Sequence, residues 1–452
     1  MDPSMLLMLS NLLHLHNHLD PMPSLLSSSP SPSSPIDPNL SSSAAPLLFF
    51  ALASVLSYAS STLNQSNSSS SPSPPPRPPP RSSSSFFLSL SSDRIWSMDP
   101  SARDAKWRSQ YGLSYPVFAT LLDHLRPHLS LSHLPVPTDH ALSIALCRLS
   151  RGVSSRSLAR SLSLPPSLIS RATHAVTRLL STRLYPDYVK TPISHRLLQT
   201  ISSFKDLTSL PNCCGFIASS PVRLRLPSSE DDEFENLLSP NRSYPSILLQ
   251  VVSDHRKIFW DACVRAPGSS DPSSHFRDSS LYDRLSTKIL RDSVITVRGH
   301  HVRPYIVGDS SYPLLPFLLT PFASGSASAA AANPTHETFN AAVSKGRSAS
   351  VEAAIALLKG RWKILRNLNV GLNHAAQTVV ACVVLHNMCQ IAGEPEDDGK
   401  YLWRDPPESL QLARPVENEH SLYYAGENLR QALAEDLYEK QQRLSRAGAG
   451  PR

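Results

Sequence analysis

Cysteine is scarce in this 452-residue chain and forms no metal or redox motif. No two cysteines have the C-x-x-C spacing, so the sequence indicates neither a zinc module nor a disulfide framework. Scattered cysteines in apolar surroundings are typical of small buried hydrophobic residues in a reducing compartment. They stand at positions 147, 213, 214, 263, 382 and 389.

A long uninterrupted hydrophobic run is also missing. The best candidate for a membrane span, APLLFFALASVLSYAS at residues 45–60, is short and is interrupted by Ser, Tyr and Pro. No basic flank precedes it, and it begins too late for a typical secretory signal. We therefore expect a local helix or docking segment and no contact with membrane; a membrane-tethered protein is the alternative.

Charge is nearly missing from residues 1–95, which are rich in Ser, Pro and Leu. Stretches such as SSSSPSPPPRPPPRSSSS at 68–85 cannot bury apolar surface and favour a solvated, extended backbone. We predict a disordered arm over 1–95 and a helical domain over 96–200. A core domain over 201–392 and a tail with a charged helix over 393–452 follow.

Acidic residues are missing altogether from residues 140–183, the most regular helical block of the chain. Apolar spacing predicts a first helix that Gly152 ends, and Ser154 is placed to cap a second. A Leu-Pro-Pro turn ending at Pro166 then precedes a third helix. This order is typical of a helix-turn-helix.

Seven arginines lie in this acid-free block. Such a surface can lie along nucleic-acid phosphates, with the third helix offered to a groove. The alternative is a three-helix domain with a soluble, Arg-rich face. Because acids are absent throughout, we favour nucleic-acid contact by Arg148, Arg151, Arg156, Arg160, Arg171 and Arg178.

Strands and helices are grouped in the remainder of the chain. Residues 246–268 predict two strands across a tight turn at 253–255, and Tyr305 to Val307 predict another strand. Amphipathic or apolar helices are predicted over 336–368, 375–390 and 421–444. This grouping predicts an α/β fold.

Two acids stand in apolar surroundings. Asp309 ends the strand at 305–307, and Glu352 lies on a predicted helix. Paired carboxylates are typical ligands of divalent metals in phosphodiester chemistry. The alternatives are a turn or cap residue for Asp309 and a solvated helix residue, paired with Arg347 or Lys359, for Glu352.

Five further stretches resemble the PIF/Harbinger class of DDE transposases over residues 105–392. They are LPNCCGFI, VVSDHRKIFWDACVRAPGSSDPSSHFRDSSLYDRL, YIVGDSSYPLLPFLLTPF, HETFNAAVSKGRSASVEAAIALLKGRWKIL and ACVVLHNMC. The resemblance is strongest to the domesticated plant branch named for antagonism of like heterochromatin protein. It implies an RNase H-like DDE core, preceded by a helix-turn-helix, in which three acids hold two divalent metals, Mg²⁺ or Mn²⁺.

The resemblance implies that Asp309 and Glu352 are the second and third acids. The first acid, which bridges the metals, belongs at the end of the strand in CCGFI, where this chain has Ala218. We therefore expect a vestigial metal site of two mutually repelling carboxylates. Other acids, at 231, 232 and 254, lie in an insertion or at a hairpin turn and are poor substitutes.

The expected function follows from this loss. A domesticated, catalytically inactive nuclear scaffold in chromatin or transcriptional regulation is the main hypothesis, and a metal-dependent nuclease with a substitute ligand is the alternative. The family implies a Myb/SANT-like DNA-binding protein or a chromatin-repressor complex subunit as partner. The net charge of +7 and pI near 9.1 permit weak, non-specific DNA binding.

Overall fold

The computed structural model describes most of the chain after the N-terminal arm. The described residues are 97–225, 244–268, 270–287, 293–323, 333–396, 402–405 and 412–448. They all belong to one compact unit, 76–452. The arm at 1–95, its segment at 45–60 and the acidic stretch at 228–243 lie outside the described residues, so the predictions for them stay predictions.

The helices predicted over 140–183 are present with their breaks. The first described helices are α5 (Pro100–Tyr111), α6 (Tyr115–Leu129), α7 (Thr138–Arg151), α8 (Ser155–Leu162) and α9 (Pro166–Leu179). Gly152 ends α7 in the left-handed region at φ 66°, which a residue without Cβ adopts freely. Ser154 accepts a hydrogen bond from the Ser157 N–H at 3.2 Å and caps α8. Pro166 begins α9, as predicted.

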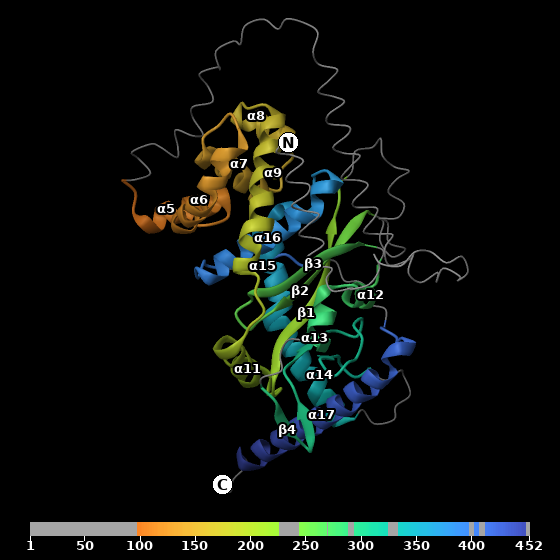
Figure 1. The fold of residues 1–452 in the computed structure, drawn as a ribbon. Coiled ribbons are helices and arrows are strands. Elements are labelled where there is room, and N and C mark those ends of the chain that lie inside the picture. Colours follow the sequence, from red (N-terminus) through yellow and green to blue (C-terminus); the bar gives the residue numbers. More distant parts are fainter. Residues whose placement is uncertain are drawn as a thin grey trace, which may run out of the picture. The chain divides into compact units, whose positions relative to one another are not determined.

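A five-stranded mixed sheet forms the centre of the structure (Figure 1). Its strands are β1 (Cys213–Arg223), β2 (Ser246–Ser253), β3 (Phe259–Pro267), β6 (Tyr305–Val307) and β7 (Leu318–Leu319). The order is β3-β2-β1-β6-β7, with β1, β2 and β3 antiparallel and β6 and β7 parallel to β1. β4 (Ile295–Val297) and β5 (His300–Val302) form a separate hairpin. The α/β prediction is therefore confirmed.

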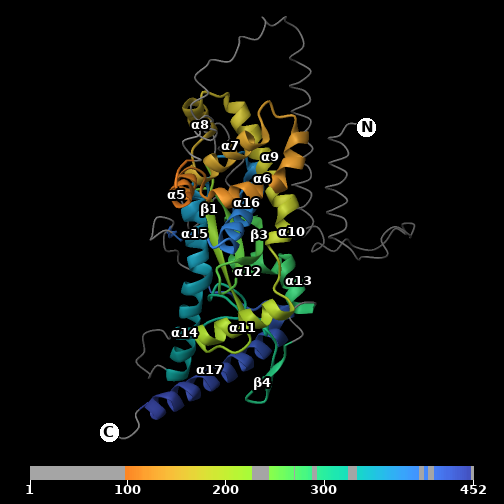
Figure 2. The ribbon, with the colours of Figure 1, turned by 90° about the vertical axis from the view of Figure 1, so that its left-hand side faces the viewer.

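Helices cover both faces of this sheet (Figures 1 and 2). Those after α9 are η3 (Leu180–Leu184), α10 (Tyr185–Tyr188), α11 (Ser194–Thr208), α12 (Pro272–Arg277), α13 (Ser280–Thr287), α14 (Pro334–Arg347), η5 (Ser348–Glu352), α15 (Ala353–Arg361), η6 (Lys363–Arg366), α16 (Leu372–Ile391), η8 (Glu417–Glu419) and α17 (His420–Gly448). The helices predicted over 336–368, 375–390 and 421–444 are confirmed, with 336–368 divided at η5 and η6. The sequence did not predict α11.

Alternate residues of β1 belong to different hydrophobic clusters. Phe216 and Ala218 join the larger cluster, which also holds buried residues of α14, α15 and α16. Ile217 points to the other face and packs with Trp260 and Phe276. This alternation is the normal period of a strand, and it directs Ala218 toward the α14 side of the sheet.

Buried residues of helices α5 to α9 and of the sheet belong to the same larger cluster, whose members run from Trp107 to Leu437 along the chain. Between α9 and α16, the rings of His174 and His374 stack at 3.7 Å. Gln377 also donates a hydrogen bond to the Thr177 hydroxyl at 2.9 Å. The division into domains at 200/201 therefore stays a prediction from sequence.

Among the helices that the structure describes, none combines the length and the hydrophobicity needed to cross a membrane. All six cysteines are described, and all are free thiols. Burial raises the pKa of the Cys213 and Cys389 thiols to about 12. These two side chains therefore pack as neutral hydrophobic groups.

Candidate functional site

Ala218 stands on β1 at the position where the resemblance implies the first acid. β1 and β6 pair in parallel up to Phe216 opposite Val307, so Ala218 and Asp309 each stand two residues beyond the last pair, at the same end of the two strands. Ala218 is buried, with 4 % of its surface exposed. Its methyl group has no lone pair to offer a metal, so β1 contributes no ligand here.

Asp309 follows β6 and Gly308, and its side chain is only 9 % exposed. Its Oδ1 accepts a hydrogen bond from the Ser311 N–H at 2.9 Å and another from the Ser311 hydroxyl. This is the turn-capping role that the sequence left open as an alternative. The second carboxylate oxygen, Oδ2, accepts a hydrogen bond from Arg347 at 3.1 Å.

Glu352 ends the π-helical turn η5, and about half of its side chain (48 %) is exposed. Its Oε2 accepts a hydrogen bond from the Ser348 hydroxyl at 2.9 Å. Of the two partners considered from sequence, Arg347 contacts Glu352, whereas Lys359 pairs with Asp405 at 2.6 Å.

Arg347 lies between the two acids. One of its nitrogens, Nη2, is 3.1 Å from Asp309 Oδ2 and 3.3 Å from Glu352 Oε1. The predicted convergence of the two acids is thus present in the structure. The positive charge of Arg347 offsets the repulsion between the two carboxylates that the sequence analysis expected, and the size of that repulsion stays a prediction.

These residues do not fit the pair of divalent metals that the DDE resemblance implies. Only two of the three carboxylates exist, and a cation already bridges them. Among the residues that the structure describes, no group of three His, Cys, Asp or Glu could hold a metal ion. We therefore assign no catalytic role to Asp309 or Glu352 and derive no step through a metal.

Other described acids near the sheet also have partners. Asp254 accepts hydrogen bonds from the backbone N–H groups of Arg256 and Ile258, each at 2.9 Å, and so stabilises the β2–β3 turn. Sequence reasoning missed Asp405, which approaches β1 from the tail. Its carboxylate accepts 2.6 Å hydrogen bonds from the Ser220 hydroxyl and from Lys359 Nζ. Neither acid is available to replace the missing ligand.

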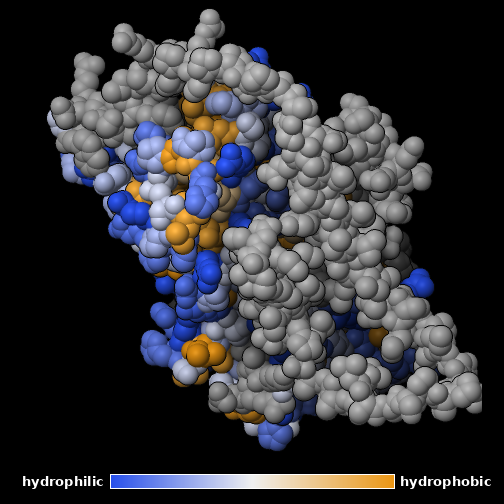
Figure 3. Space-filling model, turned by 45° about the horizontal axis from the view of Figure 1, so that its top comes forward, coloured by the Kyte–Doolittle hydropathy of each residue, from blue (hydrophilic) through white to orange (hydrophobic). Residues whose placement is uncertain are grey.

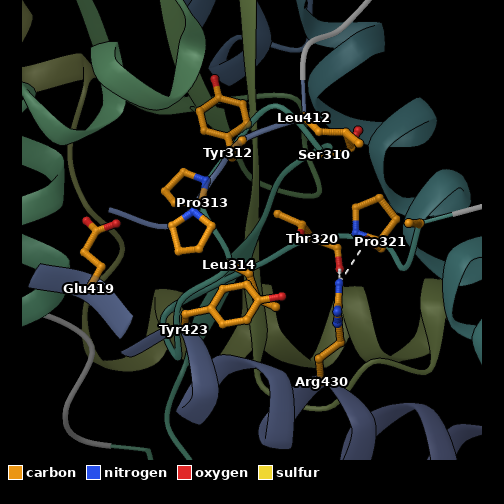
Figure 4. A pocket seen from close by; sticks show the side chains of 13 residues that line it. Ser310, Tyr312, Pro313, Leu314, Thr320, Pro321, Leu412, Glu419, Tyr423 and Arg430 are labelled. Atoms are coloured by element: carbon orange, nitrogen blue, oxygen red, sulfur yellow. Dashed lines mark hydrogen bonds between the residues drawn. The ribbon is translucent and has the colours of Figure 1, made fainter. Parts of the chain in front are cut away.

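A pocket begins one residue beyond Asp309, at Ser310 (Figure 4). Its lining comes mainly from the loop after β6, the tail at 412–415 and α17, with Tyr312 and Tyr423 among the aromatic groups. Arg430 closes one side by donating to the Thr320 and Pro321 carbonyls at 3.1 and 3.0 Å. Its only lining acid, Glu419, is paired with Arg277 at 2.8 Å. The pocket therefore adds no free carboxylate to the site.

The arginines predicted to contact nucleic acid have different surroundings. Arg148 is 2 % exposed and donates to the Asn369 carbonyl at 2.8 Å, and burial lowers its pKa to about 10. This corrects the prediction for Arg148, because a buried guanidinium cannot reach a phosphate. Figure 3 shows hydrophilic and hydrophobic groups interleaved on the face seen when the top of the molecule comes forward. Of the six arginines predicted to contact nucleic acid, the five exposed ones are Arg151, Arg156, Arg160, Arg171 and Arg178.

Comparisons with known proteins find a matching family model and several relatives. Residues 218–387 match the model of a family described as DDE superfamily endonuclease, a span that begins at Ala218 and includes Asp309 and Glu352. The chain is 28 % identical over 338 residues to the Arabidopsis thaliana protein named antagonist of like heterochromatin protein 1, covering 71 % of this chain and 80 % of that protein. It is 24 % identical over 290 residues to the Xenopus laevis protein named Putative nuclease HARBI1, covering 62 % of this chain and 76 % of that protein. No solved structure gives a significant match.

The pairing of the acids predicts unequal effects on stability. Asp309→Ala should lower the free energy of unfolding by about 1–3 kcal/mol, because it removes a buried acceptor of Ser311 and a partner of the mostly buried Arg347. Glu352→Ala should cost less than about 1 kcal/mol, because this carboxylate is half exposed and screened. Urea unfolding of the full chain measures both. Equal stability of Asp309→Ala and wild type would contradict the pairing.

Proposed function

Because this chain belongs to the Harbinger-derived relatives of DDE transposases, we propose that it is a domesticated, catalytically inactive protein. It acts as a nuclear scaffold in chromatin or transcriptional regulation. The sheet order β3-β2-β1-β6-β7, with β6 and β7 parallel to β1, supports an RNase H-like core as its framework.

The observation that carries the inactive assignment is Ala218. In a two-metal site, the ions stabilise both the attacking and the leaving oxygens of the phosphate, and ligands shared between the metals keep them close enough to do so. The β1 position beside Asp309 has only a methyl group. Asp254 and Asp405, two described acids near the sheet, have partners of their own and do not replace it. The remaining pair of carboxylates is too few for this chemistry.

The scaffold role is supported by the parts of the fold that this chain retains. The described residues form one large and one smaller hydrophobic cluster, although the ligand set lacks one acid. A relative whose name states antagonism of like heterochromatin protein covers most of this chain, which favours a role in chromatin. We propose a Myb/SANT-like DNA-binding protein or a chromatin-repressor complex subunit as partner, and the nucleus as the location.

The inactive assignment predicts that this chain does not cleave DNA. The purified full-length chain should not cut or join supercoiled plasmid or short duplex DNA with Mg²⁺ or Mn²⁺, because β1 supplies no carboxylate. Any trace activity should equal that of Asp309→Ala prepared in parallel, which identifies a contaminant. Metal-dependent cutting that Asp309→Ala abolishes would establish the alternative, a nuclease, and would end the scaffold proposal.

The second prediction concerns DNA affinity. The exposed arginines of α7 to α9 are suited to phosphate contacts, so binding should be weak, indifferent to sequence and steeply reduced by salt. The double variant Arg156→Gln/Arg171→Gln should weaken binding to every duplex alike. It should also reduce the slope of log K against log salt by about 0.9 for each arginine that no longer neutralises a phosphate.

The matched control is Arg443→Gln on α17, an arginine whose side chain is 78 % exposed. This change should leave the salt slope as it is in wild type, as measured by fluorescence anisotropy. Tight binding to one sequence by the chain alone, or equal effects of the control and the double variant, would contradict this part of the proposal.

A further inference from the structure

We propose that the Arg347 guanidinium is the resident cation of the central site, occupying the space between Asp309 and Glu352 and excluding divalent metal from it. The proposal rests on the proposed function, because an enzyme of this type would need that space for metal. It goes further by assigning the neutralising charge to one side chain.

The geometry puts both carboxylates on a single nitrogen. Arg347 Nη2 donates a hydrogen bond to Asp309 Oδ2 at 3.1 Å and forms an ion pair with Glu352 Oε1 at 3.3 Å. The acids come from separate elements, the loop after β6 and the turn η5. One guanidinium therefore ties these two elements together, as a metal between carboxylates would.

Burial makes the ion pair necessary. Asp309 is 9 % exposed and Arg347 is 18 % exposed, so both charges are largely removed from water. A buried carboxylate without a counter-charge is costly, and the Ser311 hydrogen bonds do not neutralise it. No other Lys or Arg of the described residues pairs with Asp309. The site thus needs a cation, and Arg347 supplies it.

A metal and Arg347 cannot use the same oxygens at once. Mg²⁺ requires oxygen ligands at about 2.0–2.1 Å in near-octahedral geometry, and a positive guanidinium beside it would repel it. The change at Ala218 fits this arrangement, because one positive charge suits two carboxylates better than three. Asp405, which also approaches β1, is likewise neutralised by a cationic side chain: Lys359 Nζ lies 2.6 Å from its carboxylate.

The test is Mn²⁺ binding, with Mn²⁺ alone as the probe. Electron paramagnetic resonance of free Mn²⁺ gives the affinity, and melting with and without Mn²⁺ gives an independent readout. Wild type should bind Mn²⁺ only weakly, because Arg347 lies between Asp309 and Glu352. Arg347→Gln should lower the melting temperature in metal-free buffer and bind Mn²⁺ at least about tenfold more tightly than wild type. Adding Glu352→Gln to that variant should remove the gain.

Arg298→Gln is the matched control. Arg298 also bridges two acids, Glu435 at 3.0 Å and Glu439 at 2.6 Å, but both of these acids lie on the surface of α17. If this control gains Mn²⁺ affinity as Arg347→Gln does, the response comes from any freed pair of carboxylates and the proposal fails. Arg347→Lys keeps a cation that lacks the planar fork, so its Mn²⁺ affinity should lie between those of wild type and Arg347→Gln.

Restoring the missing carboxylate separates the two proposals. Ala218→Asp alone should gain some Mn²⁺ affinity, because one guanidinium does not neutralise three carboxylates, but the positive charge of Arg347 should limit the gain. Ala218→Asp combined with Arg347→Gln should bind Mn²⁺ more tightly than either single variant. Wild type that binds Mn²⁺ as tightly as Arg347→Gln overturns this inference even when it cuts no DNA. Cleavage by wild type overturns the proposed function instead.

Discussion

The close approach of α14 to β1 is the constraint on which the central site depends. Gly346 lies against the Phe216 ring, and a Cβ at this position would come within 2.1 Å of that ring, so the helix can pack here only with glycine. Arg347 is the next residue. The packing therefore places its guanidinium where Asp309 and Glu352 converge, and the two acids, the turn η5 and the loop after β6 are held together by one cation.

The sequence predicted most elements of the core because their signals are local. Gly152, Ser154 and Pro166 divide the helices, and strand-forming residues around a turn predict β2 and β3. The two acids were predicted as a pair from their motifs. Arg347 was foreseen as a partner of Glu352 only, because helical spacing shows neighbours along the chain and not the loop after β6.

Long-range contacts account for what the sequence could not supply. The acid-free block suggested that all its arginines face solvent, yet Arg148 is buried against Asn369, more than two hundred residues away. The hydrogen bond between Asp405 and Ser220 is also a long-range contact, because no sequence pattern around Asp405 indicates that it lies near β1. Under the proposed function, a fold that keeps its core and its helices provides surfaces for partners without nuclease chemistry.

Anomalous diffraction from crystals soaked in Mn²⁺ shows directly whether Arg347 or a metal neutralises Asp309 and Glu352. We predict no manganese peak between the two carboxylates, with the Arg347 guanidinium in hydrogen-bond contact with both. A strong peak coordinated by both acids, with Arg347 displaced toward solvent, would contradict the account.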